Sequence, residues 1–75
     1  MEREQIIEYL KDIKRIASNR YNQIPITGDR QKKNYYFWVE LQIKSLLKYE
    51  HQYDDEELLQ EAMAYEDIKP LDFND

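Results

Sequence analysis

The chain has 75 residues, no cysteine, one glycine and two prolines, and its 16 acidic and 11 basic residues give a net charge of −5. A chain of this length forms one domain and buries only about 60% of the surface that its unfolded form exposes, which excludes a large catalytic cleft. The lack of cysteine also excludes a disulfide framework and a thiolate zinc site.

The hydropathy pattern predicts a cytoplasmic protein that has no membrane partner. No apolar run reaches the roughly 18 residues that span a bilayer, and the first four residues are too acidic and polar for a signal peptide. The 36% of charged residues would also suit a disordered chain. Aromatic residues make up 13% of the chain and recur at helical spacing, so we expect a folded core.

A first helix is predicted over residues 2–18. Its apolar residues recur every three or four positions, which places them on one face: Ile6, Leu10, Ile13 and Ala17, widened by Ile7, Tyr9 and Ile16. A loop over residues 19–28 follows, because it contains Pro25 and Gly28. We expect Ile24 and Ile26 in this loop to pack at the edge of the core.

A second helix is predicted over residues 29–50, with Asp29 as its N-cap. At about 100° per residue, one face carries Tyr35, Tyr36, Val39, Ile43, Leu46 and Leu47. Another side carries Phe37, Trp38, Leu41 and Tyr49. One neighbour cannot cover both, so this helix either lies between the other two helices or presents its second side to a partner.

A third helix is predicted over residues 54–66. Asp54 can act as its N-cap, and Glu57 can complete a capping box. Its buried face would contain Leu58, Leu59, Ala62, Met63 and Tyr65. The acidic segment 67–75 would form an extended tail, packed on the domain through Ile68, Leu71 and Phe73. The predicted fold is therefore an all-α, single three-helix domain over residues 1–75, with the second helix as its spine.

The net charge hides a marked difference between two parts of the sequence. Residues 1–49 contain ten basic and six acidic residues, whereas residues 50–75 contain one basic and ten acidic residues. Carboxylates in the first turn of the third helix are explained by the helix dipole. The dipole does not explain Glu61, Glu66 and Asp67. A basic surface on a partner would explain why these three residues are acidic.

These features predict a non-enzymatic interaction module that regulates or inhibits a larger protein by occupying a basic surface on it. Contact residues would be Phe37, Trp38, Leu41 and Tyr49, and the residues that steer the contact would be Glu56, Glu57, Glu61, Glu66 and Asp67. If that surface binds nucleic acid, the protein would act as a nucleic-acid mimic, as small acidic inhibitors of phages and mobile elements do. The second side of the central helix also suits a homodimer.

Two alternatives to this function remain open. One is a nucleic-acid-binding or transcription-related module that uses Arg20, Arg30, Lys32 and Lys33 with Tyr35 or Tyr36. A pI near 4.8 disfavours direct binding to a polyanion. The other alternative is a structural subunit of a homo-oligomer.

Enzymatic and metal chemistry have no support in the residue patterns. His51 is the only histidine, the acidic residues lack the spacing of a calcium-binding loop, and one glycine cannot form a phosphate-binding loop. Neither serine has a histidine in a recognisable pattern for nucleophilic catalysis. We therefore expect no catalytic residue, no metal and no cofactor.

Overall fold

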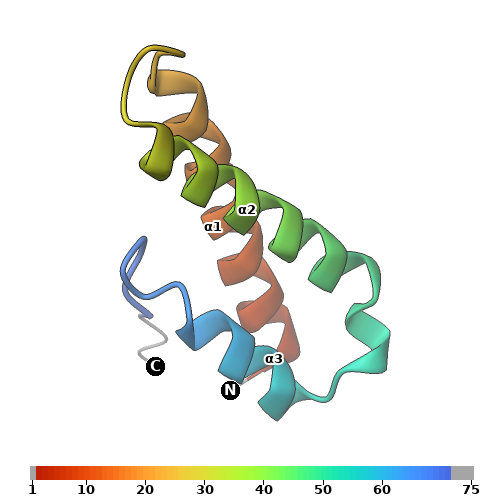
Figure 1. The fold of residues 1–75 in the computed structure, drawn as a ribbon. Helices are drawn as coiled ribbons and strands as arrows, with labels where there is room; N and C mark the ends of the chain where they lie inside the picture. Colours follow the sequence, from red (N-terminus) through yellow and green to blue (C-terminus); the bar gives the residue numbers. More distant parts are fainter. Residues whose placement is uncertain (1, 72–75) are drawn as a thin grey trace.

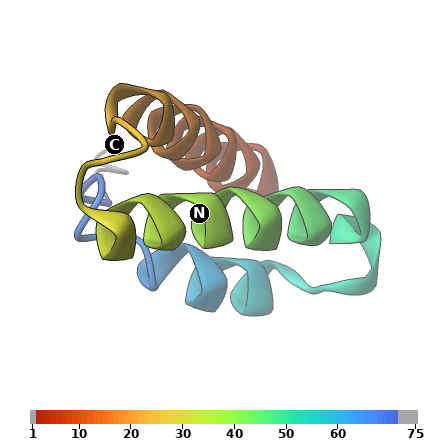
Figure 2. The ribbon, with the colours of Figure 1, turned by 45° about the horizontal axis from the view of Figure 1, so that its top comes forward.

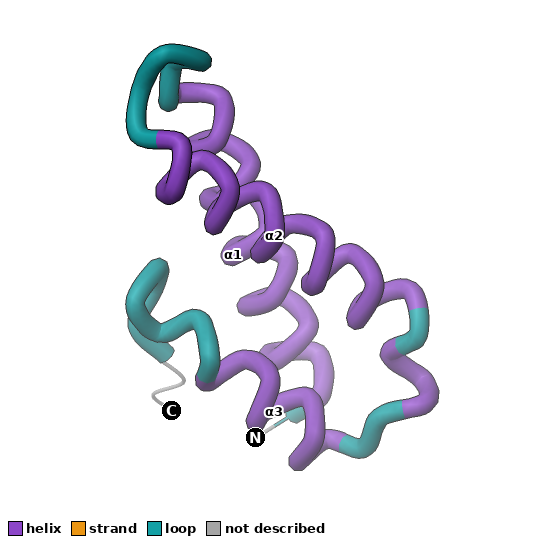
Figure 3. Tube along the Cα trace, in the orientation of Figure 1, coloured by secondary structure: helices purple, strands orange, loops and turns teal. Residues whose placement is uncertain are grey.

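Three α-helices make up most of residues 2–71, the part of the chain that the computed structural model describes. They are α1 (Arg3–Gln23), α2 (Arg30–Lys48) and α3 (Asp55–Met63), and a short 3-10 helix, η1 (Glu50–Gln52), joins the last two (Figure 1). The loop between α1 and α2 lies at one end of the molecule and η1 at the other (Figure 2). Within residues 2–71 there are helices and loops but no strand (Figure 3). The predicted all-α, three-helix fold is confirmed.

α1 is longer than predicted, and a lysine from the next helix explains where it ends. The helix continues to Gln23, and Ile24 then takes an extended conformation (φ −86°, ψ 119°), as expected for a residue that precedes proline. The ammonium group of Lys33 donates hydrogen bonds to the carbonyl oxygens of Tyr21 and Ile24, both at 2.8 Å. Lys33 therefore satisfies carbonyl groups near the end of α1. The prediction that the loop begins at residue 19 was wrong.

The predicted starts of α2 and α3 are confirmed by their capping contacts. The carboxylate of Asp29 accepts a hydrogen bond from the backbone N–H of Lys32 at 3.1 Å. At α3, Asp54 accepts from the backbone N–H of Glu57 at 2.8 Å, and the Glu57 carboxylate accepts from the N–H of Asp54 at 3.0 Å. These contacts satisfy backbone donors that the first turn of a helix leaves unpaired.

The central helix of the bundle is α1, so the prediction that the second helix forms the spine was wrong. α1 packs extensively against both α2 and α3, whereas α2 and α3 make few contacts with each other. α3 has only nine residues, too few to cover a second side of α2 along its whole length. As a result, one side of α2 faces its neighbours and the opposite side faces solvent.

The core is formed largely by the apolar faces that the spacing predicts, but Tyr35, Met63 and Ile26 are exposed. Its buried residues are Ile6, Tyr9, Leu10, Ile13, Ala17, Val39, Ile43, Leu46, Leu58, Ala62, Tyr65 and Ile68. Met63 is 50% exposed, because the short α3 packs through Leu58 and Ala62 and Met63 points away from them. Ile26 is 85% exposed in a turn closed by the hydrogen bond from the Gly28 N–H to the Pro25 carbonyl. The predictions that Met63 lies on a buried face and that Ile26 packs at the edge of the core were wrong.

The segment that follows α3 packs back on α1. α3 ends at Met63, earlier than predicted, and Ile68 is buried in the core. The Lys69 ammonium pairs with Asp12 at 2.9 Å, and the Tyr9 hydroxyl donates to the Lys69 carbonyl at 2.5 Å. Leu71 also packs against the core, as predicted, whereas Phe73 lies outside the described residues.

Arg3 ties the beginning of α1 to the connection between α2 and α3. Its guanidinium group donates to the carboxylates of Glu50 (3.0 Å) and Asp55 (2.7 Å) and to the carbonyl oxygens of Glu50 and Tyr53. The hydrogen bond to Asp55, together with the nearby Glu50, raises the pKa of Arg3. This cluster uses two acidic residues inside the fold, so part of the acidic C-terminal third has a structural role.

Candidate functional site: an exposed apolar stripe on α2

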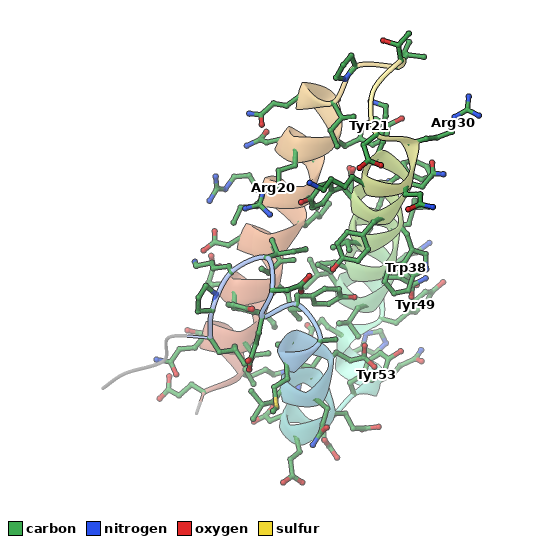
Figure 4. All side chains as sticks on the ribbon, turned by 60° about the vertical axis from the view of Figure 1, so that its left-hand side comes forward. Arg20, Tyr21, Arg30, Trp38, Tyr49 and Tyr53 are labelled. Atoms are coloured by element: carbon green, nitrogen blue, oxygen red, sulfur yellow. The ribbon has the colours of Figure 1, made fainter. Side chains whose placement is uncertain are left out.

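Three large apolar side chains, two in α2 and one at the residue that caps its C-terminal end, are exposed on the side of α2 that faces away from the core. Trp38 is 52% exposed, Leu41 47% and Tyr49 43%. Val39 and Ile43, on the opposite side of the same helix, are fully buried. Trp38 and Tyr49 lie on the same outward side of α2 (Figure 4). We call Trp38, Leu41 and Tyr49 the outer stripe.

Phe37 lies at one edge of this surface. It is 47% exposed, and its ring centroid lies 5.6 Å from that of Tyr21 in α1. Each residue of a helix is turned by about 100° from the one before it. Phe37 and Trp38 are therefore about 100° apart around α2, and Leu41, one turn further along, lies between them. The four predicted contact residues are therefore all exposed, with Phe37 leaning toward α1.

Tyr35 is 36% exposed and Tyr36 is partly buried, and both contact other parts of the fold. The Tyr35 hydroxyl donates to the Asp67 carboxylate at 3.0 Å, and burial together with this contact raises its pKa to about 12. Tyr36 is partly buried against the core, with the Arg20 guanidinium 5.6 Å from its ring centroid. Of the four consecutive aromatics, Trp38 is thus the most exposed.

The predicted acidic residues divide into two groups. Glu57 caps α3 and Asp67 accepts from Tyr35, so both have partners within the fold. Glu56, Glu61 and Glu66 are exposed, and within residues 2–71 none of the three forms an ion pair. Of the acidic residues that the helix dipole does not explain, Asp67 therefore has a structural role. Its partner, Tyr35, lies 32 residues earlier in the chain.

The structure brings Arg20 and Tyr36, two residues of the nucleic-acid alternative, into contact and places the others at several sites. Arg20 packs on Tyr36, and Lys33 lies over the ring of Tyr21 at 3.9 Å while it caps α1. Arg30 and Lys32 are exposed at the first turn of α2, and Figure 4 shows Arg30 at the loop end of the bundle, away from Arg20.

Sequence reasoning missed a shallow groove between α1 and α2. Its volume is about 480 Å³, and it is lined by Lys11, Lys14, Arg15, Ser18, Asn19, Glu40 and Leu47. The pattern gave no signal for it, because its lysines and arginine match an ordinary solvated helix face. Three cations and one carboxylate line it, so its composition suits an anionic group better than an apolar one.

Neither a metal site nor a membrane helix is found in the described part of the chain. Residues 2–71 contain no cluster of histidine, cysteine and acidic side chains that could hold an ion. None of their helices is long and apolar enough to cross a bilayer. His51 lies exposed in η1.

The fold and the outer stripe define a small three-helix protein with one uncovered apolar helix face. No protein-family model matches the chain, and no curated protein or solved structure matches it either. Its function is therefore inferred from its own side chains.

Proposed function

We propose that the protein is a non-enzymatic protein–protein interaction module that regulates or inhibits a larger protein by covering a basic surface on it. The observation that carries this proposal is the outer stripe of α2. A tryptophan, a leucine and a tyrosine there are each between 43% and 52% exposed. Tryptophan and tyrosine are the residue types that most often dominate binding energy in protein interfaces.

The exposed carboxylates support a basic partner. Glu56, Glu61 and Glu66 belong to α3 and the turn that follows it, and this turn reaches α2 at the contact between Tyr35 and Asp67. Charges beside an apolar contact steer a partner of opposite charge and raise the rate of association. In this mechanism the outer stripe provides most of the binding energy, and the three exposed carboxylates favour partners with a basic surface. If the partner's basic surface holds nucleic acid, the protein would compete with it.

Affinity capture with three forms of the chain tests this proposal. The wild type, Trp38→Ala and Met63→Ala would each be used on a native lysate, with and without nuclease. Met63 is the matched control, since it is an equally exposed apolar residue outside the stripe. We expect the wild type and Met63→Ala to retain one common protein and Trp38→Ala to lose it, with nuclease making no difference.

Two results would contradict the proposal. If Trp38→Ala and Met63→Ala captured the protein equally well, the outer stripe would not be part of the contact. Capture that disappears on nuclease treatment would show that nucleic acid, and not a protein surface, forms the link.

A further inference from the structure

The outward face of α2 has a residue pattern that is complementary to itself. It presents Asn34, Trp38, Leu41 and Ser45, all exposed, at successive spacings of four, three and four residues. This is the spacing of a two-helix seam, in which each residue of one helix meets a residue of the other. The order polar, apolar, apolar, polar is the same in both directions along the helix.

We propose that two copies of the chain pair through this face, with their α2 helices antiparallel and centred between positions 38 and 41. A two-fold axis requires a surface that complements itself, and the palindromic order meets that requirement. Trp38 of each copy would pack on the second copy's Leu41. Asn34 would lie opposite the second copy's Ser45, so an amide meets a hydroxyl.

One edge of the seam brings a cation of each copy to an aromatic ring of the other. Phe37 and Lys44 lie on one edge, which an antiparallel two-fold pair places against the same edge of the second copy. Each Lys44 ammonium then lies near the second copy's Phe37 ring, a favourable contact between a cation and an aromatic face. A parallel pair would instead place Lys48 near the second copy's Lys48.

The opposite edge contains uncharged side chains. Tyr49 would lie beside the second copy's Gln31, and Gln42 and Tyr35 share this side of the helix. Among the residues of α2, the seam and its edges include no acidic side chain, and Glu40 points toward the groove with α1 instead. The Asp67 carboxylate lies beside this edge, where it accepts a hydrogen bond from the Tyr35 hydroxyl. Pairing therefore buries no carboxylate of α2.

The exposed area predicts a weak dimer. Phe37, Trp38, Leu41 and Tyr49 together expose roughly 400 Å² of side chain, whereas a stable interface buries about 800 Å² on each partner. Each copy also carries a net charge of −5, and Arg30 would approach the second copy's Lys48 at the ends of the pair. Salt screens both repulsions, so self-association should increase with ionic strength.

This inference uses the surface of the proposed function but does not depend on it. A basic partner would have to displace the second copy, and the two events respond to salt in opposite directions. Binding steered by carboxylates weakens as salt increases. Failure of one proposal therefore leaves the other standing.

Sedimentation equilibrium on the full chain tests the dimer, at concentrations from about 10 µM to about 1 mM and at low and high salt. We expect the mass of the wild type to rise from one copy to two, at lower concentration in high salt. Leu41→Glu, which places a charge at the centre of the seam, should remain at one copy. Met63→Glu places the same charge on an equally exposed apolar site of α3 and should behave as the wild type.

Introduced cysteines test the orientation, because the chain has no cysteine of its own. Asn34→Cys mixed with Ser45→Cys should give a disulfide-linked pair on mild oxidation, and Asn34→Cys alone should give little. Efficient cross-linking of Asn34→Cys with itself would overturn the antiparallel arrangement. A wild type that stays at one copy at every concentration and salt, or a Leu41→Glu variant that associates equally well, would overturn the dimer.

Discussion

α1 and α2 differ in how their apolar residues are covered, although they have similar lengths of 21 and 19 residues. The apolar face of α1 is almost fully buried, because α2 and α3 both pack on it. α2 packs mainly on α1, and its outer stripe remains exposed. The comparison shows that the number of neighbouring helices, and not the number of apolar residues, limits how much of a helix can be buried in so small a domain.

The largest expected effect comes from the same truncation made on each helix. Leu10 in α1 is fully buried and Leu41 in α2 is 47% exposed. Leu10→Ala should lower the free energy of unfolding by about 2–5 kcal/mol, because it leaves a cavity in the core. Leu41→Ala should change it by less than about 0.5 kcal/mol. Chemical denaturation followed by helical circular dichroism measures both, at concentrations where the chain is monomeric. Equal losses would show that the outer stripe is part of the core.

An intermediate effect is expected at alkaline pH from Tyr9 of α1. Burial, with the nearby Glu66 and Asp67 adding to it, raises the pKa of Tyr9 to about 12 from an ordinary value of 10.0. Between these values the unfolded chain loses the proton and the folded chain keeps it. Stability is therefore fully present below pH 10 and falls as the pH rises toward 12, by an amount on the order of 1 kcal/mol.

Tyr9→Phe is the matched variant for this titration. It removes the ionising group and the hydrogen bond to the Lys69 carbonyl, so it should be less stable at neutral pH. Its unfolding free energy should decline less steeply above pH 10 than that of the wild type. If the free energy of unfolding fell equally steeply above pH 10 in both proteins, the pKa of Tyr9 would not be raised in the folded chain.

The smallest effect on stability is expected at Trp38. Because its side chain is 52% exposed, Trp38→Ala should change the free energy of unfolding by less than about 0.5 kcal/mol and leave the helical content unchanged. Thermal unfolding monitored by circular dichroism checks this. Loss of the fold in this variant would place Trp38 among the residues that hold α2 on α1.

Local patterns predicted most of the inward face of each helix, but they did not predict which helix is central. The spacing of Ile6, Leu10 and Ile13 specifies a buried stripe on α1, and capping residues specify where α2 and α3 begin. The four consecutive aromatic residues of α2 suit either a helix that lies between two others or a helix with one side in an interface. Which of the two holds depends on how much of α2 is covered by α3, and this is decided by packing between segments that are distant in the sequence.

Two contacts between different elements were also beyond local patterns. α1 continues to Gln23, and Lys33, a residue of the next helix, donates to carbonyl groups near its end. The acidic pair after α3 looked unexplained because the partner of Asp67 is Tyr35, in the first half of the sequence. Contacts between side chains of different elements leave no periodic signal in a single sequence. The exposure of the outer stripe could be anticipated only as one of two outcomes.

The cap that Lys33 places on α1 also bears on the order in which the chain folds. Its hydrogen bonds join residues only nine and twelve positions apart, so they close short loops at a small entropic cost. The contacts that hold α3, from Arg3 to Asp55 and from Tyr9 to Lys69, span 52 and 60 positions. We therefore expect the hairpin of α1 and α2 to form first and α3 to dock on it later.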